Sequence, residues 1–194
     1  MNLPNRLTIL RLILACIYFV LLAFAENKGA FNPALLDIAL GLFIIAIITD
    51  VLDGYLARRY NMVTNFGRIA DPFVDKVLIC GSFVFFVAWT QIREFMPAWM
   101  LVVILGREFL VSAIRAFAES RNIPFGSSFW GQHKMTIQSI TIIAALIYLR
   151  FFLTNQTFWI VVTLKSLIWL TLVTTVISGI TYILCYRKIK QLKT

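Results

Sequence analysis

Charged residues are scarce in this chain. They make up 14% of its 194 residues, whereas hydrophobic residues make up 60%. In an ordinary soluble domain about a quarter of the residues are charged. Acidic residues are the scarcer sign, with nine Asp and Glu against 18 Lys and Arg. This composition excludes an ordinary soluble domain and predicts a protein that places most of its length in a lipid bilayer.

Cysteine and histidine are also nearly absent. Cys16, Cys80 and Cys185 form no CxxC pair and no metal-ligand spacing, so we expect them to pack in the core. His133 is the only histidine. It is predicted to be a solvated interface residue, and a substrate contact beside Lys134 is the alternative. Low-complexity segments, internal repeats and long linkers are missing too, which predicts a single domain over residues 1–194.

Long apolar runs are what the chain has instead. A transmembrane helix needs about 20 apolar residues, and the sequence holds six such runs. We therefore predict an all-α fold, an integral membrane bundle of six transmembrane helices. The first run is too long for the apolar core of a cleaved signal peptide. The predicted spans cover residues of about 7–25, 34–57, 72–91, 96–118, 135–153 and 158–185.

Basic residues are distributed unevenly between the connecting segments. Lys and Arg are enriched in the cytoplasmic loops of membrane proteins, so their positions predict a multi-pass cell-membrane protein with both termini in the cytoplasm. The net charge of +9 then reflects topology and attraction to anionic lipid. No basic stripe with interleaved aromatic residues suggests nucleic acid as a partner. The basic residues that lie on the predicted cytoplasmic side are Arg6, Arg58, Arg59, Arg68, Arg115, Arg121, Lys134, Arg187, Lys188, Lys190 and Lys193.

Four aspartates interrupt the apolar sequence. Asp50 and Asp53 are three residues apart, and Asp71 and Asp75 are four apart, so each pair shares one face of a helix. We expect the two acidic faces to meet at the cytoplasmic ends of neighbouring helices. Carboxylates gathered in an apolar protein repel one another and are costly to desolvate. A divalent cation is therefore predicted among them, and ion pairs with nearby Arg and Lys side chains are the alternative.

This acidic cluster suggests a type of chemistry. Mg²⁺ is held by a few carboxylates together with substrate phosphates and water. Two such ions can clamp a diphosphate and stabilise charge on the attacked phosphorus and on the leaving group. Arg58 can pair with a phosphate oxygen, and a spare carboxylate can accept the proton of an attacking hydroxyl. The residues therefore indicate phosphoryl transfer at the membrane surface.

The spacing of these residues resembles a family signature. The pattern D-x2-D-G-x2-A-R-x8-G-x3-D-x3-D is that of the CDP-alcohol phosphatidyltransferases, and all eight of its positions are filled. They are Asp50, Asp53, Gly54, Ala57, Arg58, Gly67, Asp71 and Asp75. The resemblance implies six transmembrane helices, a homodimer, and two Mg²⁺ or Mn²⁺ ions.

The resemblance also implies roles for the signature residues. Asp50, Asp53, Asp71 and Asp75 would be metal ligands, and Asp75 would also be the general base. The cytidine nucleotide of CDP-diacylglycerol would be bound by a set made of Asn5, Thr8, Asp50, Gly54, Ala57, Arg58 and Gly67. For Thr8 and its neighbour Arg11, a helix cap and an arginine that extends to the membrane surface are the alternatives.

Two further segments resemble bacterial phosphatidylglycerophosphate synthases within this family. They are the opening segment, residues 2–11, and a segment in the fourth predicted span, residues 106–115. The implied acceptor is glycerol 3-phosphate, which would take the phosphatidyl group from CDP-diacylglycerol and release CMP. The segment Gly131–Thr136 departs from the pattern of these synthases, because Gln132 and Met135 stand where lysine and threonine are usual.

Three basic residues agree with a phosphorylated acceptor. Arg107 lies in the middle of a predicted span, where a charge is costly and usually functional. Arg107, Arg115 and Lys134 are predicted to bind the phosphate of the acceptor. The alternatives are an internal ion pair of Arg107 with Glu108 or with an aspartate of the cluster, and extension of the other two side chains to the membrane surface.

The positions of the acidic residues help to separate other functions that are compatible with the composition. Phosphatidylinositol-phosphate and cardiolipin synthases are alternatives within the family. An intramembrane prenyltransferase would carry two aspartate-rich motifs far apart, whereas all four aspartates here fall between residues 50 and 75. A non-enzymatic cation transporter would spread its acids through the depth of the membrane. A phosphatidyltransferase is therefore the predicted function.

Overall fold

The structure of the protein is a computed structural model. It describes residues 3–27, 29–59, 65–121, 129–153 and 157–191. Within these ranges, burial and side-chain contacts are described for all residues except 3–7, 53–59, 65–69, 71, 119, 129–132 and 186–191.

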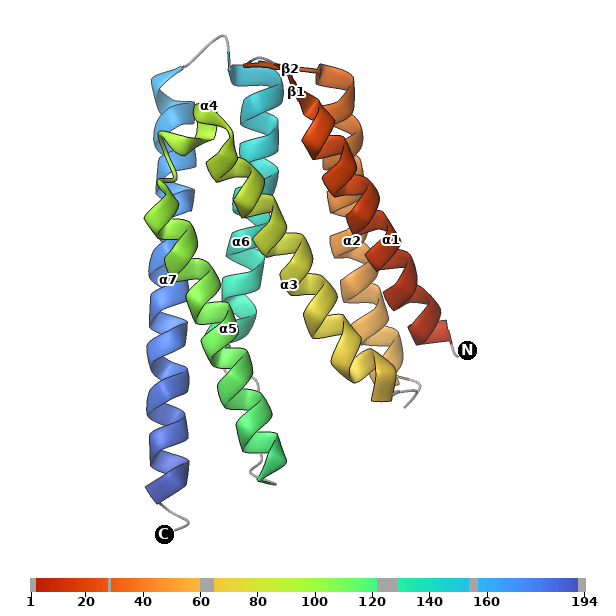
Figure 1. Cartoon of the computed structure of the whole chain (residues 1–194), viewed down its shortest axis with the longest axis vertical. Helices are drawn as coiled ribbons and strands as arrows, with labels where there is room; N and C mark the ends of the chain where they lie inside the picture. The colour runs from red at the N-terminus through yellow and green to blue at the C-terminus, as the bar shows by residue number, and fades with distance from the viewer. Residues whose placement is uncertain (1–2, 28, 60–64, 122–128, 154–156, 192–194) are drawn as a thin grey trace.

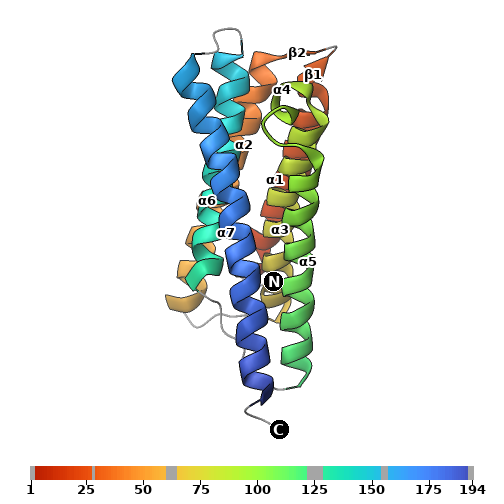
Figure 2. The same ribbon diagram turned by 90° about the vertical axis from the view of Figure 1, so that its left-hand side faces the viewer.

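Six long helices make up nearly all of the described chain, and they lie side by side as an elongated bundle (Figures 1 and 2). They are α1 (Leu3–Ala25), α2 (Pro33–Arg59), α3 (Asn65–Ala88), α5 (Ala98–Ser120), α6 (Phe129–Ile147) and α7 (Phe158–Gln191). The shorter elements are α4 (Thr90–Arg93), a π-helical turn η1 (Tyr148–Phe152), and the strands β1 (Glu26–Asn27) and β2 (Ala30–Phe31). The predicted helical bundle is confirmed, and each long helix overlaps one predicted span.

The small hairpin β1–β2 is a feature that the sequence did not predict. Asn27 pairs with Ala30 across a two-residue connection, and Gly29 adopts a φ of 85°. Two-residue hairpin connections need positive φ values, which glycine adopts without strain. The backbone N–H of Gly29 also donates to the Glu26 carboxylate at 2.7 Å. The chain therefore reverses between α1 and α2 within a few residues.

Helix starts follow local sequence signals. Pro33 is the first residue of α2, where its missing N–H is harmless. The side chain of Asn32 accepts a hydrogen bond from the N–H of Ala34 at 3.0 Å and so caps this helix. By contrast, α3 begins at Asn65 and runs through Pro72, the residue at which the third span was predicted to start. A proline inside a helix removes one backbone hydrogen bond and crowds the carbonyl four residues earlier. Membrane helices tolerate it because neighbouring groups satisfy the freed backbone.

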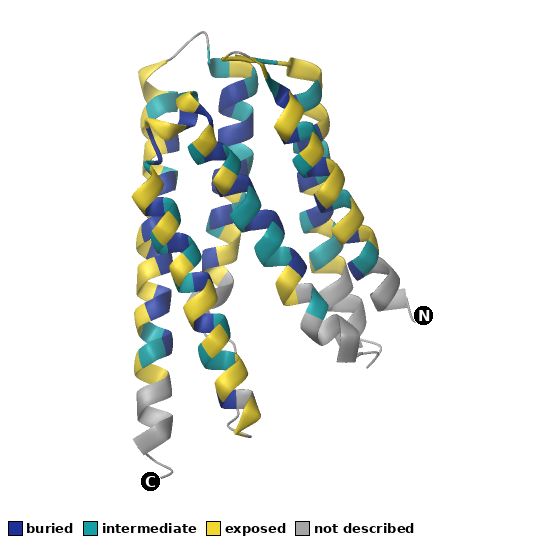
Figure 3. Cartoon of the chain, viewed as in Figure 1, coloured by how far each residue is buried: buried dark blue, intermediate teal, exposed yellow. Residues whose placement is uncertain are grey.

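Many large hydrophobic side chains lie on the outside of the bundle, where Figure 3 shows exposed residues along the long helices. Phe24, Phe109 and Trp159 are each more than 70% exposed, which in water would be a large unfavourable surface. Four helices are long and apolar enough to cross a membrane over Thr8–Ala25, Pro33–Leu52, His133–Phe152 and Phe158–Cys185. The middle of α5 is charged, and the described side chains of α3 run unbroken only from 72 to 88. The described residues thus establish a membrane-embedded protein with at least four candidate spans.

Polar side chains are gathered inside the bundle instead. Thr171, Thr175 and Ser178 of α7 are buried. Thr171 and Thr175 contact α6, whereas Ser178 contacts Arg107 of α5. Thr141 and Thr171 share a hydrogen bond of 2.8 Å, and Gln138 donates to Thr175 at 3.5 Å. Hydrogen bonds of this kind join helices in lipid, where apolar contacts give no net driving force.

The two ends of the bundle differ in content. The start of α1, the end of α2, the start of α3 and the ends of α5 and α7 lie toward the lower end in Figure 1. The hairpin, α4 and the start of α7 lie at the upper end. The positions that carry the signature aspartates are therefore at the same end of the bundle as the start of α1 and the end of α7.

The expectation that all three cysteines pack in the core is wrong for two of them. Cys16 and Cys185 are exposed, and Cys80 is half-buried. A thiol is only weakly polar, so its position on the apolar outer surface carries little penalty in a membrane. None of the three has a disulfide partner.

Candidate active site

Arg11 of α1 links two of the predicted site aspartates. Its Nη1 lies 2.7 Å from Oδ1 of Asp50 on α2 and 3.3 Å from Oδ1 of Asp75 on α3. The Arg11 side chain is only 1% exposed, whereas those of Asp50 and Asp75 are 37% and 19% exposed. The alternative in which Arg11 extends to the membrane surface is therefore wrong. The two acidic helices meet through a buried cation supplied by α1, which packs along both of them.

This arrangement has a simple electrostatic cause. Two carboxylates brought together in a poorly solvated site repel each other. A guanidinium between them removes that repulsion, and its planar fork lets it contact acids on two helices at once. Thr8, one turn before Arg11 on α1, is also buried, at 2% exposure. Thr8 therefore lies on the face of α1 that points toward the aspartates.

The donor atoms fit a hard divalent cation. Asp50 and Asp75 offer carboxylate oxygens to one point from two different helices, and Mg²⁺ takes such ligands. Among the side chains that the structure describes, no group of three or more His, Cys, Asp or Glu converges. The other two predicted ligands, Asp53 and Asp71, lie in α2 and α3 but outside the described side chains. The described residues thus supply two of the four predicted ligands.

Several predicted nucleotide-binding residues also lie outside the described side chains. Their backbones belong to helices: Asn5 to α1, Gly67 to α3, and the remaining three to α2. Those three are Gly54, Ala57 and Arg58. Of the predicted nucleotide-binding set, the structure therefore positions the side chains of Thr8 and Asp50.

A cavity of about 270 Å³ opens beside Asp75. It is enclosed by α3, α5, α6 and α7, and all three predicted phosphate-binding residues line it: Arg107, Arg115 and Lys134. Lys76 lines it as well. Four basic side chains from three helices thus share one cavity with the predicted base.

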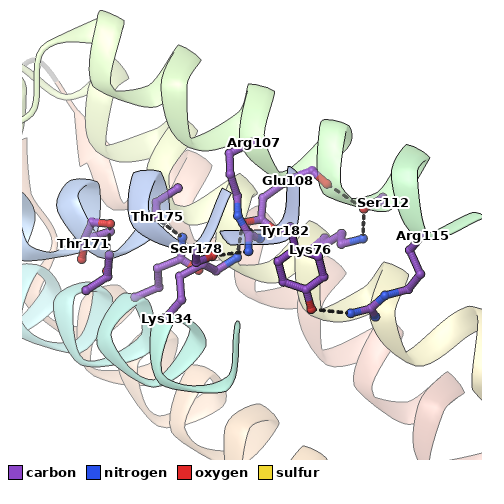
Figure 4. A network of polar contacts seen from close by, with 12 residues as sticks. Lys76, Arg107, Glu108, Ser112, Arg115, Lys134, Thr171, Thr175, Ser178 and Tyr182 are labelled. Carbon is purple, nitrogen blue, oxygen red and sulfur yellow. Dashed lines mark hydrogen bonds and ion pairs between the residues drawn. The ribbon is translucent and has the colours of Figure 1, made fainter. Parts of the chain in front are cut away.

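Glu108 holds two of these basic residues (Figure 4). Its Oε1 contacts Nζ of Lys134, and Nη1 of Arg107 donates to the same oxygen at 3.2 Å. Arg107 also donates to the hydroxyl of Ser178 on α7. The side chains of Arg107, Glu108 and Lys134 are all less than 10% exposed. The internal pair of Arg107 with Glu108, an alternative raised by the sequence, is therefore present, and Lys134 does not extend to the membrane surface.

The other two basic residues contact neutral hydroxyls. Nη2 of Arg115 donates to the hydroxyl of Tyr182 at 2.9 Å, and Nζ of Lys76 donates to the hydroxyl of Ser112. Ser112 in turn donates to the backbone carbonyl of Glu108 at 2.6 Å. Arg115 is therefore held inside the bundle as well, and its extension to the membrane surface is not observed.

The segment that departs from the synthase pattern, Gly131–Thr136, lies near the start of α6, and its side chains are only partly described. Met135 lines the cavity, His133 is exposed, and the side chain of Gln132 lies outside the described residues. Exposure of His133 agrees with the interface residue predicted from the sequence. The thioether of Met135 offers the cavity an apolar and polarisable surface in place of a hydroxyl.

Sequence reasoning missed four contributors to this site. Lys76, Ser112, Ser178 and Tyr182 all hydrogen-bond inside it. A signal existed for Ser178 and Tyr182, because hydroxyl residues recur every three or four positions along the apolar run of α7, as expected for one helix face that points into a bundle. Lys76 follows Asp75 directly, but nothing in the local sequence tells which way a lysine in the middle of α3 points.

Comparison with known proteins assigns the chain. The family model for CDP-alcohol phosphatidyltransferases matches residues 1–183. A CDP-diacylglycerol–glycerol-3-phosphate 3-phosphatidyltransferase of Bacillus subtilis is 32% identical over 188 residues, which is 93% of both chains. A protein of the same name from Rickettsia bellii is 41% identical over 116 residues, covering 60% of this chain and 59% of its own. A probable phosphatidylglycerophosphate synthase of Mycobacterium tuberculosis is 34% identical over 141 residues, covering 73% of this chain and 64% of its own.

The chain therefore belongs to the CDP-alcohol phosphatidyltransferase family. This confirms the family predicted from the signature. The family is one of membrane proteins that use divalent metal ions, in agreement with the apolar surface of the bundle and with the carboxylates around Arg11.

Proposed function

We propose that this protein transfers the phosphatidyl group of CDP-diacylglycerol to glycerol 3-phosphate, which gives phosphatidylglycerophosphate and CMP. The observation that carries the proposal is the shared cavity: Asp75 lines it together with Arg107, Arg115 and Lys134. An acidic group able to accept a proton thus lies beside basic groups suited to a phosphate. The names of the three relatives described above support the same acceptor.

Asp75 is the proposed catalytic base. A hydroxyl of glycerol 3-phosphate attacks the phosphorus that bears the diacylglycerol and loses its proton to the Asp75 carboxylate. A new P–O bond forms to the acceptor, the bond to the CMP oxygen breaks, and CMP leaves as the anion. Arg11, at 3.3 Å from Asp75, orients this carboxylate toward the reacting groups.

The aspartates are also the proposed metal ligands. Asp50, Asp53, Asp71 and Asp75 would hold Mg²⁺ or Mn²⁺, as two ions, and such ions would stabilise the negative charge that develops on the diphosphate. Asn5, Thr8, Asp50, Gly54, Ala57, Arg58 and Gly67 would surround the nucleotide. The burial of Thr8 beside Arg11 supports a diphosphate near the start of α1.

The cationic side of the cavity would bind the acceptor. Arg107 and Lys134 are held by Glu108 before any substrate arrives, so their positions are set in advance and little ordering is needed on binding. Arg115 adds a guanidinium from the same helix as Arg107. A neutral acceptor such as inositol or choline would bring no anionic group to this cavity, in which basic residues outnumber acidic ones.

Placement in the membrane follows from the same geometry. We propose that all six long helices cross the cell membrane, that both termini and the active site are cytoplasmic, and that the protein is a homodimer. The start of α1, the end of α7 and the aspartate positions gather at one end of the bundle. This supports placing both termini and the active site on the same side of the membrane. Basic residues near that end favour the cytoplasm.

An acceptor panel tests the function. Purified protein in detergent, supplied with CDP-diacylglycerol and Mg²⁺, is expected to release CMP with glycerol 3-phosphate and to give no comparable release with inositol phosphate, phosphatidylglycerol or glycerol. Chelation with EDTA should abolish the release, and added Mn²⁺ should restore it. CMP release with inositol phosphate or phosphatidylglycerol alone would assign the chain to one of the other synthases of the family.

Replacement of Arg115 tests the acceptor site. The Arg115→Ala variant is expected to raise the KM for glycerol 3-phosphate by about tenfold to a hundredfold, because a charge-assisted hydrogen bond to the phosphate is lost. The KM for CDP-diacylglycerol should stay within about twofold. Arg121→Ala is the matched control, because Arg121 is exposed at the end of α5 and stacks on the Phe117 ring. An unchanged KM in the Arg115 variant would remove Arg115 from the site.

A further inference from the structure

Lys76 differs from the basic residues that the sequence singled out. It follows Asp75 on α3 and is half-buried, and its Nζ reaches across to the Ser112 hydroxyl of α5 (Figure 4). It lines the same cavity as Asp75 and Arg115. The side chain thus brings a positive charge into the cavity from the helix that carries the proposed base.

The four basic residues of the cavity fall into two pairs. Arg107 and Lys134 contact the Glu108 carboxylate. Within the described part of the chain, Lys76 and Arg115 contact only hydroxyls, those of Ser112 and Tyr182, and they form no ion pair there. One pair is therefore in direct contact with a carboxylate, and the other is not.

This difference decides which cations an incoming anion contacts most readily. A buried charge without a counter-ion is unfavourable, so an anion that reaches it recovers part of the desolvation energy. A phosphate can replace a hydroxyl at Lys76 or Arg115 without separating an existing ion pair. At Arg107 or Lys134 it must share the cation with Glu108. Lys76 and Arg115 therefore offer the larger gain.

We propose that Lys76 is a further binding residue for the phosphate of the acceptor, and that it acts together with Arg115. This rests on the proposed function, in which the acceptor is a phosphate monoester. Lys76 leaves the hydroxyl of Ser112 and donates to a phosphate oxygen when the acceptor enters. Because Lys76 and Asp75 are consecutive on α3, the bound phosphate is held at a fixed separation from the base. The site therefore selects acceptors in which the hydroxyl and the phosphate are no farther apart than this separation.

The charge of the cavity agrees with such a ligand. Among the described residues that line it, four are basic and two, Asp75 and Glu108, are acidic. The formal excess is two positive charges, which matches a phosphate monoester dianion. A phosphodiester headgroup carries one negative charge and would leave the excess only half compensated. Lys76 therefore contributes to the choice of acceptor as well as to its binding.

The test is the substitution Lys76→Gln, compared with Lys165→Gln. Lys165 is an exposed lysine of α7 whose Nζ lies 5.5 Å from the centre of the Phe95 ring, and it does not line the cavity. In Lys76→Gln the KM for glycerol 3-phosphate is expected to rise about tenfold to a hundredfold. The KM for CDP-diacylglycerol should stay within about twofold of wild type. Lys165→Gln should leave both constants unchanged.

A binding measurement makes the test independent of turnover. Glycerol 3-phosphate is expected to raise the Tm of the wild-type protein and of Lys165→Gln, because a ligand that binds only the folded state stabilises it. The shift should be lost in Lys76→Gln at the same concentration. Lys76→Arg, which keeps the charge, should restore most of the shift. Lys76→Met keeps the aliphatic stem and replaces the glutamine variant if that variant does not fold.

Several outcomes would overturn the proposal. An unchanged KM and an unchanged Tm shift in Lys76→Gln would show that Lys76 does not contact the acceptor. An equal rise of both KM values, or failure of both the Gln and Met variants to fold, would assign Lys76 a structural role only. These results differ from failure of the proposed function, which would appear as absence of CMP release by the wild-type protein with glycerol 3-phosphate.

Discussion

The Asp75→Asn variant is expected to remain folded and to release CMP about 10²-fold to 10⁴-fold more slowly than the wild type. Asparagine has nearly the same shape but no basic oxygen, so it cannot take the proton of the attacking hydroxyl. It also removes one of the proposed metal ligands. The measurement is kcat for CMP release at saturating CDP-diacylglycerol and glycerol 3-phosphate. Because chemistry and not acceptor binding is lost, kcat should fall far more than the KM for glycerol 3-phosphate rises.

A matched control is available on α2. Asp37 pairs with Arg150 of η1 at 2.8 Å, and its side chain is 48% exposed. It does not line the cavity. Asp37→Asn therefore removes the same charge from an arginine pair outside the site, and kcat should stay within about twofold. If Asp75→Asn retains more than a tenth of the wild-type kcat, another group is the base.

Folding of the Asp75 variant can be expected from its surroundings. Arg11 keeps its 2.7 Å contact with Asp50 when the Asp75 charge is removed, so the buried guanidinium retains a counter-charge. The asparagine oxygen can still accept a hydrogen bond from Arg11. Loss of the fold would therefore contradict the position of Arg11 between the two acids. Far-UV circular dichroism and gel filtration in detergent distinguish a folded, inactive variant from an unfolded one.

The Glu108→Gln variant is expected to lose stability, by about 3–5 kcal/mol. This is the usual range when one partner of a buried ion pair is removed and the remaining charge stays uncompensated. Here two cations remain, Arg107 and Lys134, and both side chains are less than 10% exposed. Their mutual repulsion adds to the loss. The check is a lower Tm in detergent, together with a lower midpoint of chemical unfolding if that unfolding is reversible.

Two comparisons separate this effect from a general effect of glutamate loss. Glu94→Gln, at an exposed position after α4, should change stability by less than about 0.5 kcal/mol. Adding Lys134→Met to Glu108→Gln should recover much of the loss, because one of the two uncompensated charges is removed and an apolar side chain fills its space. If the single variant were as stable as wild type, the Glu108 carboxylate would not hold the two cations in the folded protein.

The helices themselves were well predicted from the sequence, for a physical reason. In a bilayer each segment must satisfy its own backbone hydrogen bonds, so a long apolar run has little choice but to form a helix. The run that became α1 was predicted to end at residue 25, and the helix ends there. The limits of other helices were predicted less well where charged residues occur. The helix α3 begins before Pro72, and α7 extends past its apolar run to Gln191.

The candidate site was predicted less completely. The aspartates identified the family because the signature consists of residue types at fixed spacings, and such spacings place them on one face of a helix. Arg11, which contacts Asp50 and Asp75, was named only with alternatives, and Lys76 was not proposed as a binding residue. Whether the side chain of an arginine or lysine in a membrane helix extends to the surface or turns inward depends on its neighbours in space. Those neighbours come from α2, α3 and α5, and no local pattern brings them together.

The sequence by itself determined the helices, their approximate limits and the family, because each of these follows from residues that are close together in the chain. Only the tertiary structure decided which charges compensate one another: Arg11 with two aspartates, Glu108 with Arg107 and Lys134, and hydroxyls alone with Lys76 and Arg115. These pairings depend on the packing of α1 against α2 and α3, on the packing of α5 against α3 and α7, and on the contact of Lys134 on α6 with α5. Electrostatic interactions act between atoms that are near in space, and packing places residues as far as 113 positions apart in the chain within reach of each other.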